Sequence, residues 1–276
     1  MGHVHANNVA HSGTAQLVGV VDVNRDAAHK LADATGARAF DTADGALEAL
    51  SKDGLDGVMI CTSTDTHVEM ITKVAAKRLP IFCEKPVDLD MAKVERCLAD
   101  VKKAGVPLLM GFNRRFDPSF KALRDRVRAG DVGAVESVTI TSRDPQPPPP
   151  AYVKVSGGLF RDMMIHDLDM ARYLLGEEPV SVFAAGSVLV DPEIGKAGDV
   201  DTATVVMKTA RGAQLVISNS RRASYGYDQR IEVFGSKGAL LANNATPTTI
   251  TALTGAHVST DKPFHFFLER YADAYR

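Results

Sequence analysis

The 276-residue sequence has few cysteines, almost no net charge and no long hydrophobic run. Its three cysteines, Cys61, Cys83 and Cys97, form neither a disulfide framework nor a zinc-binding pattern, so we expect free thiols and a cytoplasmic protein. A formal net charge of −2 gives no electrostatic basis for binding nucleic acid or an acidic membrane surface. No apolar stretch approaches the roughly 18 residues of a membrane span, and the N-terminus MGHVHANNVA lacks the apolar core of a signal peptide.

Strand-like and helix-like segments alternate over the first half of the chain. Continuous apolar runs, typical of buried parallel strands, occupy residues 15–23, 55–62, 79–86 and 106–113. Amphipathic helices are expected between them, at residues 25–36, 65–78 and 89–105. This alternation predicts an α/β domain over residues 1–112, a Rossmann-type doubly wound parallel sheet with right-handed crossovers.

The second half has a different pattern and predicts an α+β domain over residues 113–276. After a helix at 119–133 and a strand at 134–144, the proline-rich stretch 145–158 is expected to be a loop, although it could also bind a partner as a polyproline helix. A helix follows at 157–176. Short alternating strands then dominate, with turn signals at 211–212 and 235–238, and predict a large, mainly antiparallel, open-faced sheet. The expected strands are 181–190, 201–209, 213–223, 229–243 and 247–253.

Three groups of residues could carry chemistry. Asp162, His166 and Asp169 recur at i, i+4 and i+7, so they would share one helix face as a metal site, a base with its orienting acid, or a solvated edge. Asp22 lies at the end of the strand 15–23, where an acid can bind the ribose hydroxyls of a dinucleotide and favour NAD over NADP. Alternatively, Asp22 only caps the helix or forms the turn that follows the strand. Lys85 lies at the end of the strand 79–86, at the edge where α/β sheets bind ligands, so it could contact a substrate. Alternatively, it is an ordinary surface lysine.

Taken together, five segments resemble the Gfo/Idh/MocA oxidoreductase family over essentially the whole chain. They are CTSTDTHVEM, FCEKPVDLD, GFNRRFDPSF, GGLFRDMMIHDLDMARYLLG and FGSKG. The resemblance implies an NAD-dependent enzyme that oxidises a secondary ring alcohol of a cyclic polyol or sugar to a ketone, with myo-inositol the expected substrate. Because an open sheet face usually finds a partner, we also expect a homodimer or homotetramer formed through that face. The alternatives are a non-catalytic NAD-sensing regulator on the same fold and an inactive truncated remnant.

The resemblance also assigns residue roles. Lys85, Asp162 and His166 are the expected catalytic residues, with His166 as general base, Asp162 as its orienting acid and no metal ion. The substrate is expected to contact these three residues together with Arg115, Asp144 and Tyr227. The expected NAD-binding residues are Gly2, Asp22, Thr62, Ser63, His67, Glu84, Lys85 and Arg114.

The sequence departs from the family pattern at both ends. It has no strand followed by G-x-G-x-x-G, and Gly2 resembles the last of those three glycines. The missing strand would be central in the sheet, and HFFLERYADAYR resembles only the start of a long closing helix. We therefore expect a chain truncated at both ends that, as written, binds NAD weakly or not at all.

Overall fold

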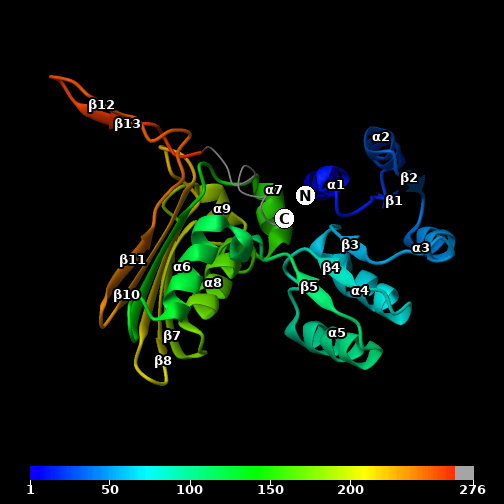
Figure 1. Cartoon of the computed structure of the whole chain (residues 1–276), viewed down its shortest axis with the longest axis horizontal. Coiled ribbons are helices and arrows are strands. Elements are labelled where there is room, and N and C mark those ends of the chain that lie inside the picture. Colours follow the sequence, from blue (N-terminus) through cyan, green and yellow to red (C-terminus); the bar gives the residue numbers. More distant parts are fainter. Residues whose placement is uncertain (265–276) are drawn as a thin grey trace. The chain divides into compact units, whose positions relative to one another are not determined.

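The computed structural model of the chain describes residues 1–264, and these form two compact units. The first unit ends at Gly111 and the second begins at Phe112 (Figure 1). Each unit has its own hydrophobic core, and each is described below by itself.

The first unit contains short parallel strands. β1 (Gly19–Val21) pairs with β2 (Arg38–Phe40), and β3 (Val58–Ile60), β4 (Ile81–Cys83) and β5 (Leu108–Met110) form a second sheet in that order. The parallel sheet is as predicted, but no pairing within residues 1–264 joins β1 to β3, so it is divided in two. Each strand is three residues long and shorter than its apolar run, which extends beyond the residues that find a partner.

The helices of this unit begin and end at the residues that capping rules favour. The Asn24 side chain accepts a hydrogen bond from Ala27 N, and Asp90 does the same for Ala92 N. Gly36 and Gly105 end their helices in the left-handed conformation. The helices are α1 (Gly2–His11), α2 (Arg25–Thr35), α3 (Ala43–Ser51), η1 (Thr64–Thr66), α4 (His67–Ala76) and α5 (Met91–Ala104). Ile60, Ile71, Ile81, Cys83 and Val101 are among the buried residues of the core.

The second unit is built on a six-stranded mixed sheet. Its order is β11-β10-β6-β9-β8-β7, and β6 runs parallel to β9 while all other neighbours are antiparallel. The strands are β6 (Val135–Arg143), β7 (Pro179–Ser187), β8 (Thr202–Thr209), β9 (Gln214–Ser220), β10 (Asp228–Gly235) and β11 (Gly238–Ala242). The predicted turns at 211–212 and 235–238 join β8 to β9 and β10 to β11, which confirms the mainly antiparallel sheet.

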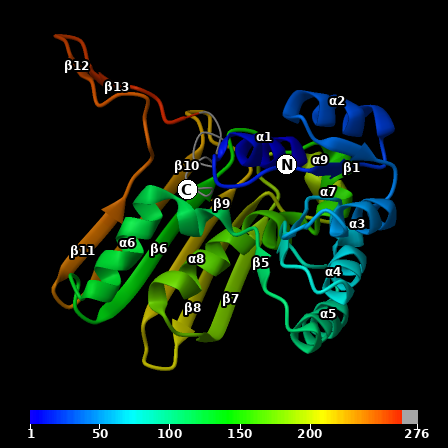
Figure 2. The ribbon, with the colours of Figure 1, turned by 45° about the vertical axis from the view of Figure 1, so that its right-hand side comes forward.

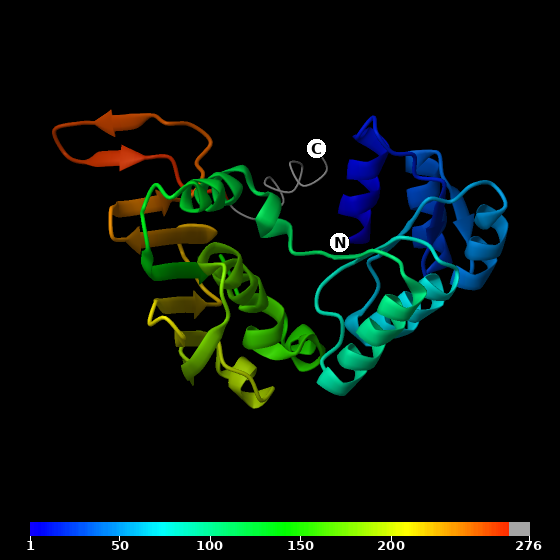
Figure 3. The ribbon, with the colours of Figure 1, turned by 60° about the horizontal axis from the view of Figure 1, so that its bottom comes forward.

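Helices cover one face of this sheet. α6 (Pro118–Ala129) and α8 (Ile165–Leu175) cross the strands on the same side, whereas no helix within residues 1–264 covers the other side, called the bare face below (Figures 2 and 3). Residues in β8 and β10 are alternately buried and exposed, because successive side chains point to opposite faces. Val138, Ile140, Leu159, Met170, Leu215 and Ile217 are among the residues buried between the sheet and the helices.

Several predicted elements differ from the structure. The expected loop 145–158 contains helix α7 (Pro150–Ser156), because a proline at the first helical position needs no N–H. The expected helix 157–176 begins as a π-helical segment, η3 (Leu159–Met163), before α8. The expected strand 247–253 is reduced to β12 (Thr251–Leu253), which pairs with β13 (Val258–Thr260).

The structure contains four further short elements that the sequence analysis did not predict. The stretch between the expected elements of the first unit holds β2 and α3, and the second unit adds η2 (Asn113–Phe116) and the short helix α9 (Pro192–Lys196). The closing helix expected at residues 265–276 lies outside the described residues. No helix within residues 1–264 is both long and apolar enough to cross a membrane.

Candidate active site

Polar side chains collect at one end of the six-stranded sheet, on the face covered by helices. Ser142 on β6 is in register with Asn219 on β9 and with Gln229 on β10. Because side chains alternate along a strand, the residues two positions further point to the same face. These are Asp144, Arg221 and Tyr227, and Asp144 N still donates to Ser220 O at 3.0 Å. Two polar rows therefore lie side by side under the helices.

The inner row holds α8 through a buried ion pair. Asp167 is fully buried and pairs with Arg114, while Asn219 Nδ2 donates to Asp167 Oδ2 at 2.9 Å. Arg114 Nη2 donates to Ser142 Oγ at 3.1 Å, and Gln229 Nε2 donates to the same hydroxyl. Every charged group here has a partner of opposite charge or a hydrogen bond, which a buried charge requires.

The outer row brings together two acids that the sequence analysis selected. Arg221 Nη1 donates to Asp144 Oδ2 at 3.0 Å and Arg221 Nη2 donates to Asp162 Oδ2 at 3.1 Å. Tyr152 on α7 donates its hydroxyl proton to Asp162 Oδ1 at 3.0 Å. Burial raises the pKa of Asp144, while Arg221 opposes that rise. Arg221 was not predicted as a site residue.

Tyr227 lies in the same row. Its hydroxyl interacts with Arg114, and burial raises the pKa of Tyr227 to about 12 despite that arginine. The phenol therefore stays protonated at neutral pH and can donate or accept a hydrogen bond. This is compatible with its predicted substrate contact, which stays a prediction.

The segment that carries Asp162 is shaped by two glycines. Gly157 and Gly158 both have positive φ, and a Cβ on Gly158 would lie only 2.5 Å from Asp199 Oδ1. Because Gly158 has no side chain, the Asp199 carboxylate fits beside it and accepts a hydrogen bond from Leu159 N at 2.9 Å. The next turn is wide, because Met164 N donates to Leu159 O at 2.8 Å, five residues back.

This geometry changes the expected single helix face. Asp162 lies in η3 and contacts Arg221 and Tyr152, whereas His166 lies in the first turn of α8 with its ring 6.4 Å from that of Phe112, edge to face. Asp169 belongs to neither group, because Arg115 binds both of its oxygens, at 2.8 and 2.6 Å. Asp169 is therefore separate from the other two residues of the i, i+4, i+7 pattern, and the pairing of Asp162 with His166 stays a prediction.

The two arginines after β5 are used within the second unit. Arg115 pairs with Asp169 and lies over the ring of Tyr173 at 5.1 Å, and Arg114 is buried against Asp167. These contacts favour structural roles for both side chains. The predicted contacts of Arg115 with substrate and of Arg114 with NAD remain predictions that these ion pairs do not support.

In the first unit, the predicted cofactor residues gather at the carboxyl ends of β3 and β4. Glu84 N donates to Ile60 O at 2.9 Å, so Lys85 emerges beside the segment that carries Thr62 and Ser63. A Cβ on Gly2 would lie 3.8 Å from Cys61 Cβ, which places the start of α1 at this edge. A helix N-terminus attracts anions, and carboxyl ends of parallel strands are the ligand-binding edge of such sheets. If NAD binds here, Gly2 at the start of α1 would hold its pyrophosphate and Asp22, after β1, would hold its ribose, as predicted.

Two buried histidines connect these segments. His5 Nε2 lies 2.6 Å from Glu84 Oε1 and ties α1 to the residue preceding Lys85. His67 Nδ1 lies 2.7 Å from Pro86 O and His67 Nε2 lies 3.1 Å from Thr62 O. His67 is thus predicted to bind NAD but contacts backbone carbonyls here, which fits a role in holding the edge. His5 was missed, since only the fold brings it to Glu84.

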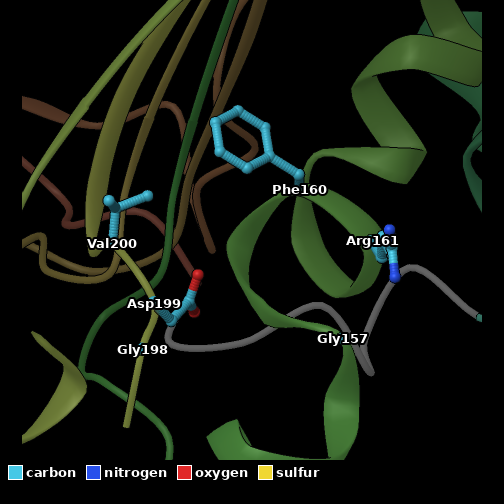
Figure 4. A pocket seen from close by; sticks show the side chains of 6 residues that line it. All are labelled: Gly157, Phe160, Arg161, Gly198, Asp199 and Val200. Atoms are coloured by element: carbon cyan, nitrogen blue, oxygen red, sulfur yellow. The ribbon is translucent and has the colours of Figure 1, made fainter. Parts of the chain in front are cut away.

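Other candidate centres carry no chemistry of their own. Within the described part of the chain, no three His, Cys, Asp or Glu side chains converge as a metal site. The cysteines are free, and burial raises the pKa of Cys61 to about 12, which keeps its thiol protonated. A hollow of about 410 Å³ beside η3 contains none of the predicted residues, and Asp199 there is already engaged by Leu159 N (Figure 4). Its lining residues are Gly157, Phe160, Arg161, Gly198, Asp199 and Val200.

Comparison with known proteins agrees with this organisation. Residues 1–112 match the oxidoreductase family with an NAD-binding Rossmann fold, and residues 120–241 match the GFO/IDH/MocA C-terminal domain. The chain is 52% identical to inositol 2-dehydrogenase of Rhizobium meliloti and 48% identical to myo-inositol 2-dehydrogenase of Thermotoga maritima. Each match covers 100% of this chain and 82% of the relative.

A solved structure gives the same result. A putative myo-inositol dehydrogenase from Sinorhizobium meliloti superposes with a TM-score of 0.92 at 51% identity, over 99% of this chain and 82% of that one. The predicted family, fold class and NAD cofactor are confirmed by these matches. The chain belongs to the Gfo/Idh/MocA family of NAD-dependent oxidoreductases.

Proposed function

We propose that this protein oxidises one secondary alcohol of a cyclic polyol to a ketone with NAD, and that the polyol is myo-inositol. The observation that carries the proposal is that Arg221 joins two acids, Asp144 and Asp162. Asp162 precedes His166 by four residues, about one helical turn. The names of the two relatives at 52% and 48% identity support the choice of inositol.

In the proposed reaction, the alcohol loses a proton from its hydroxyl group and a hydride from the carbon that carries it. His166 accepts the hydroxyl proton, and the neighbouring acid Asp162 stabilises the imidazolium that results. Lys85 stabilises the negative charge that develops on the reacting oxygen. NAD, when bound, supplies the hydride acceptor.

The polar outer row suits a ligand made of hydroxyl groups. An ionised carboxylate accepts hydrogen bonds only, whereas a hydroxyl both donates and accepts. Asp144 and Asp162 therefore match hydroxyl donors, and the protonated Tyr227 can serve either role. A ring with a hydroxyl on every carbon can meet several of these groups at once.

We also propose that the protein is a homodimer or homotetramer associated through the bare face of the six-stranded sheet. Phe183, Val206 and Val216 lie side by side on that face, on β7, β8 and β9. A reducing, cytoplasmic setting is part of the same proposal, supported by three cysteines that are all free thiols.

The test is steady-state turnover of NAD with myo-inositol, other inositol isomers and hexoses. We expect myo-inositol to give the highest kcat/KM. His166→Ala should lower kcat by roughly 100-fold, the usual scale of general-base catalysis, without weakening NAD binding. His29→Ala, on the exposed part of α2, is the matched control and should keep full activity. Near-normal turnover by His166→Ala would remove the histidine from the mechanism, and a clear preference for a non-inositol sugar would overturn the substrate.

A further inference from the structure

We propose that Arg221 is a positioning residue for this reaction, which holds Asp144 and Asp162 in one fixed arrangement and neutralises one of their two charges. The inference rests on the proposed function and goes beyond it, because neither the family match nor the sequence motifs assign a role to Arg221. The three side chains Asp144, Arg221 and Asp162 are called the Arg221 cluster below.

The geometry of the Arg221 cluster is that of a bridge. One Nη atom binds Asp144, which follows β6, and the other binds Asp162 in η3, so a single guanidinium joins two different elements. Its side chain is only 5% exposed, compared with 19% for Asp144 and 12% for Asp162. The most deeply buried member is thus the cation, and the acids reach further toward solvent.

Arg221 is itself held in place from behind. Its backbone N–H donates to Asp201 O at 2.8 Å, directly after β9. The Asp201 carboxylate is anchored in turn by the backbone N–H groups of Leu189, Val190 and Asp191, at 2.8 to 3.0 Å. The guanidinium therefore projects from a rigid point, and its planar fork fixes the direction of both acids.

Two donors constrain the orientation of Asp162. Tyr152 occupies Oδ1 and Arg221 occupies Oδ2, so the carboxylate plane cannot turn without losing one of them. A carboxylate that orients a general base must keep its direction within a small angle for proton transfer to stay efficient. This is why the loss of Arg221 should affect turnover more than substrate affinity.

The charge balance gives a second consequence. In the Arg221 cluster one guanidinium faces two carboxyl groups, so it offsets part of their negative charge. The charged and titratable groups that face Asp144 include Arg221, Arg114, Asp162, Tyr152 and Tyr227. Without Arg221, Asp144 would remain buried near another carboxylate and would take up a proton at a higher pH.

The test compares Arg221→Gln and Arg221→Lys with Arg222→Gln, a neighbouring exposed arginine outside the cluster. Infrared spectra recorded near neutral pH report the C=O stretch of any protonated carboxyl group. We expect Arg221→Gln to gain such a band, and Arg221→Lys and Arg222→Gln not to gain it. In the double variant Arg221→Gln/Asp144→Asn the new band should disappear.

Turnover provides the second measurement. We expect kcat of Arg221→Gln to fall roughly 30- to 100-fold with KM changed less than about threefold, the pattern expected for a misaligned base. The acid limb of its pH profile should move to higher pH, and Arg221→Lys should recover part of kcat. A thermal scan of each variant separates these effects from simple unfolding.

Two results would overturn the proposal. One is an Arg221→Gln protein that is folded, gains no protonated carboxyl and turns over like Arg222→Gln. The other is an Arg221→Gln protein that gains the protonated carboxyl band but keeps the kcat of wild type. The infrared arm needs neither NAD nor substrate, so a wild-type protein that oxidises no polyol would refute the proposed function while the charge balance was still measured.

Discussion

Asp22 directly follows β1, and its carboxylate is held in the turn because Oδ1 accepts a hydrogen bond from Asn24 N at 2.8 Å. Arg25, the nearest cation in sequence, points to Asp41 instead, at 3.1 Å. Arg25 is thus engaged by Asp41, and Asp22 is the residue predicted to bind the ribose of NAD. A 2′-phosphate close to the Asp22 carboxylate would be penalised by about 1–3 kcal/mol.

We therefore predict that the protein prefers NAD to NADP and that Asp22→Ser relaxes this preference. The ratio of kcat/KM for NADP to that for NAD should rise about 10- to 100-fold, which corresponds to the penalty above at 1.4 kcal/mol per factor of ten. Asp26→Ser, in the first turn of α2, is the control and should leave the ratio unchanged. Equal kcat/KM for both cofactors in the wild type would contradict the role of Asp22.

At the scale of single residues, the sequence predicts a functional residue when its signal comes from residues close to it in the chain, and misses contacts between residues far apart in sequence. The spacing of Asp162 and His166 and the position of Lys85 after a strand are local signals, and they led to these residues. Arg221, which binds Asp162, is 59 residues away and directly follows β9, so only the fold reveals this contact. His5 and Glu84, 79 residues apart, are a second example.

At the scale of elements, the missed pieces are short or contain residues usually read as breakers. β2 has three residues, too few to show a periodicity. α3 does carry a signal, because Thr42 accepts a hydrogen bond from Gly45 N and Leu47 and Leu50 lie on its buried face. α7 was hidden by four consecutive prolines, although the last of them occupies the one position where a helix accepts proline.

The loop before α9 is an element whose stability should depend on pH. Asp201 is fully buried, which by itself would raise its pKa, but the N–H groups of Leu189, Asp191 and Val190 hold the pKa below its ordinary value. The folded pKa is therefore lower than the unfolded one, near 3.9. A group of this kind stabilises the fold above the unfolded pKa, and that contribution is lost as the pH falls through the folded pKa.

We predict that Asp201→Asn lowers the melting temperature at pH 7 and that its deficit relative to wild type shrinks as the pH falls below about 4. Asparagine presents an NH₂ group to donors that now bind a carboxylate, so hydrogen bonds are lost at neutral pH. Thermal scans monitored by circular dichroism between pH 7 and pH 3 provide the measurement. Asp33→Asn, on the exposed side of α2, should match wild type throughout. A deficit that is the same at every pH would mean that charge at Asp201 plays no part.

At the scale of the whole molecule, the sequence predicts the class of each unit better than its strand order. Alternating burial in β8, β9 and β10 tells which face is covered, but it does not reveal that β6 and β9 are parallel neighbours. That pairing depends on how the chain crosses between them, through α7, α8, β7 and β8. The same limitation applies to the bare face, whose residues are scattered in sequence and become a surface only in register.

Register lines up one residue from each strand across the bare face. Leu241, Glu232, Thr139, Val216, Val206 and Phe183 follow one another across the sheet, from β11 to β7. The polar residues lie toward β10 and β6, and the apolar ones are adjacent on β9, β8 and β7. Phe183 is 68% exposed and Val206 is 40% exposed. An apolar patch of this kind, formed by adjacent strands, is typical of a surface that another protein covers.

We predict that the wild-type protein sediments as a dimer or tetramer and that Phe183→Asp shifts it toward the monomer. A carboxylate in the centre of an interface must be desolvated without a partner, which costs several kcal/mol and is enough to raise the dissociation constant by a factor of 100 or so. Val155→Asp, on an exposed position of α7 that is 67% accessible, introduces the same charge away from the sheet and should leave the assembly intact. Sedimentation velocity over a range of protein concentrations measures both. A wild-type monomer at all concentrations, or an oligomer that Phe183→Asp does not weaken, would exclude the bare face as the contact between copies.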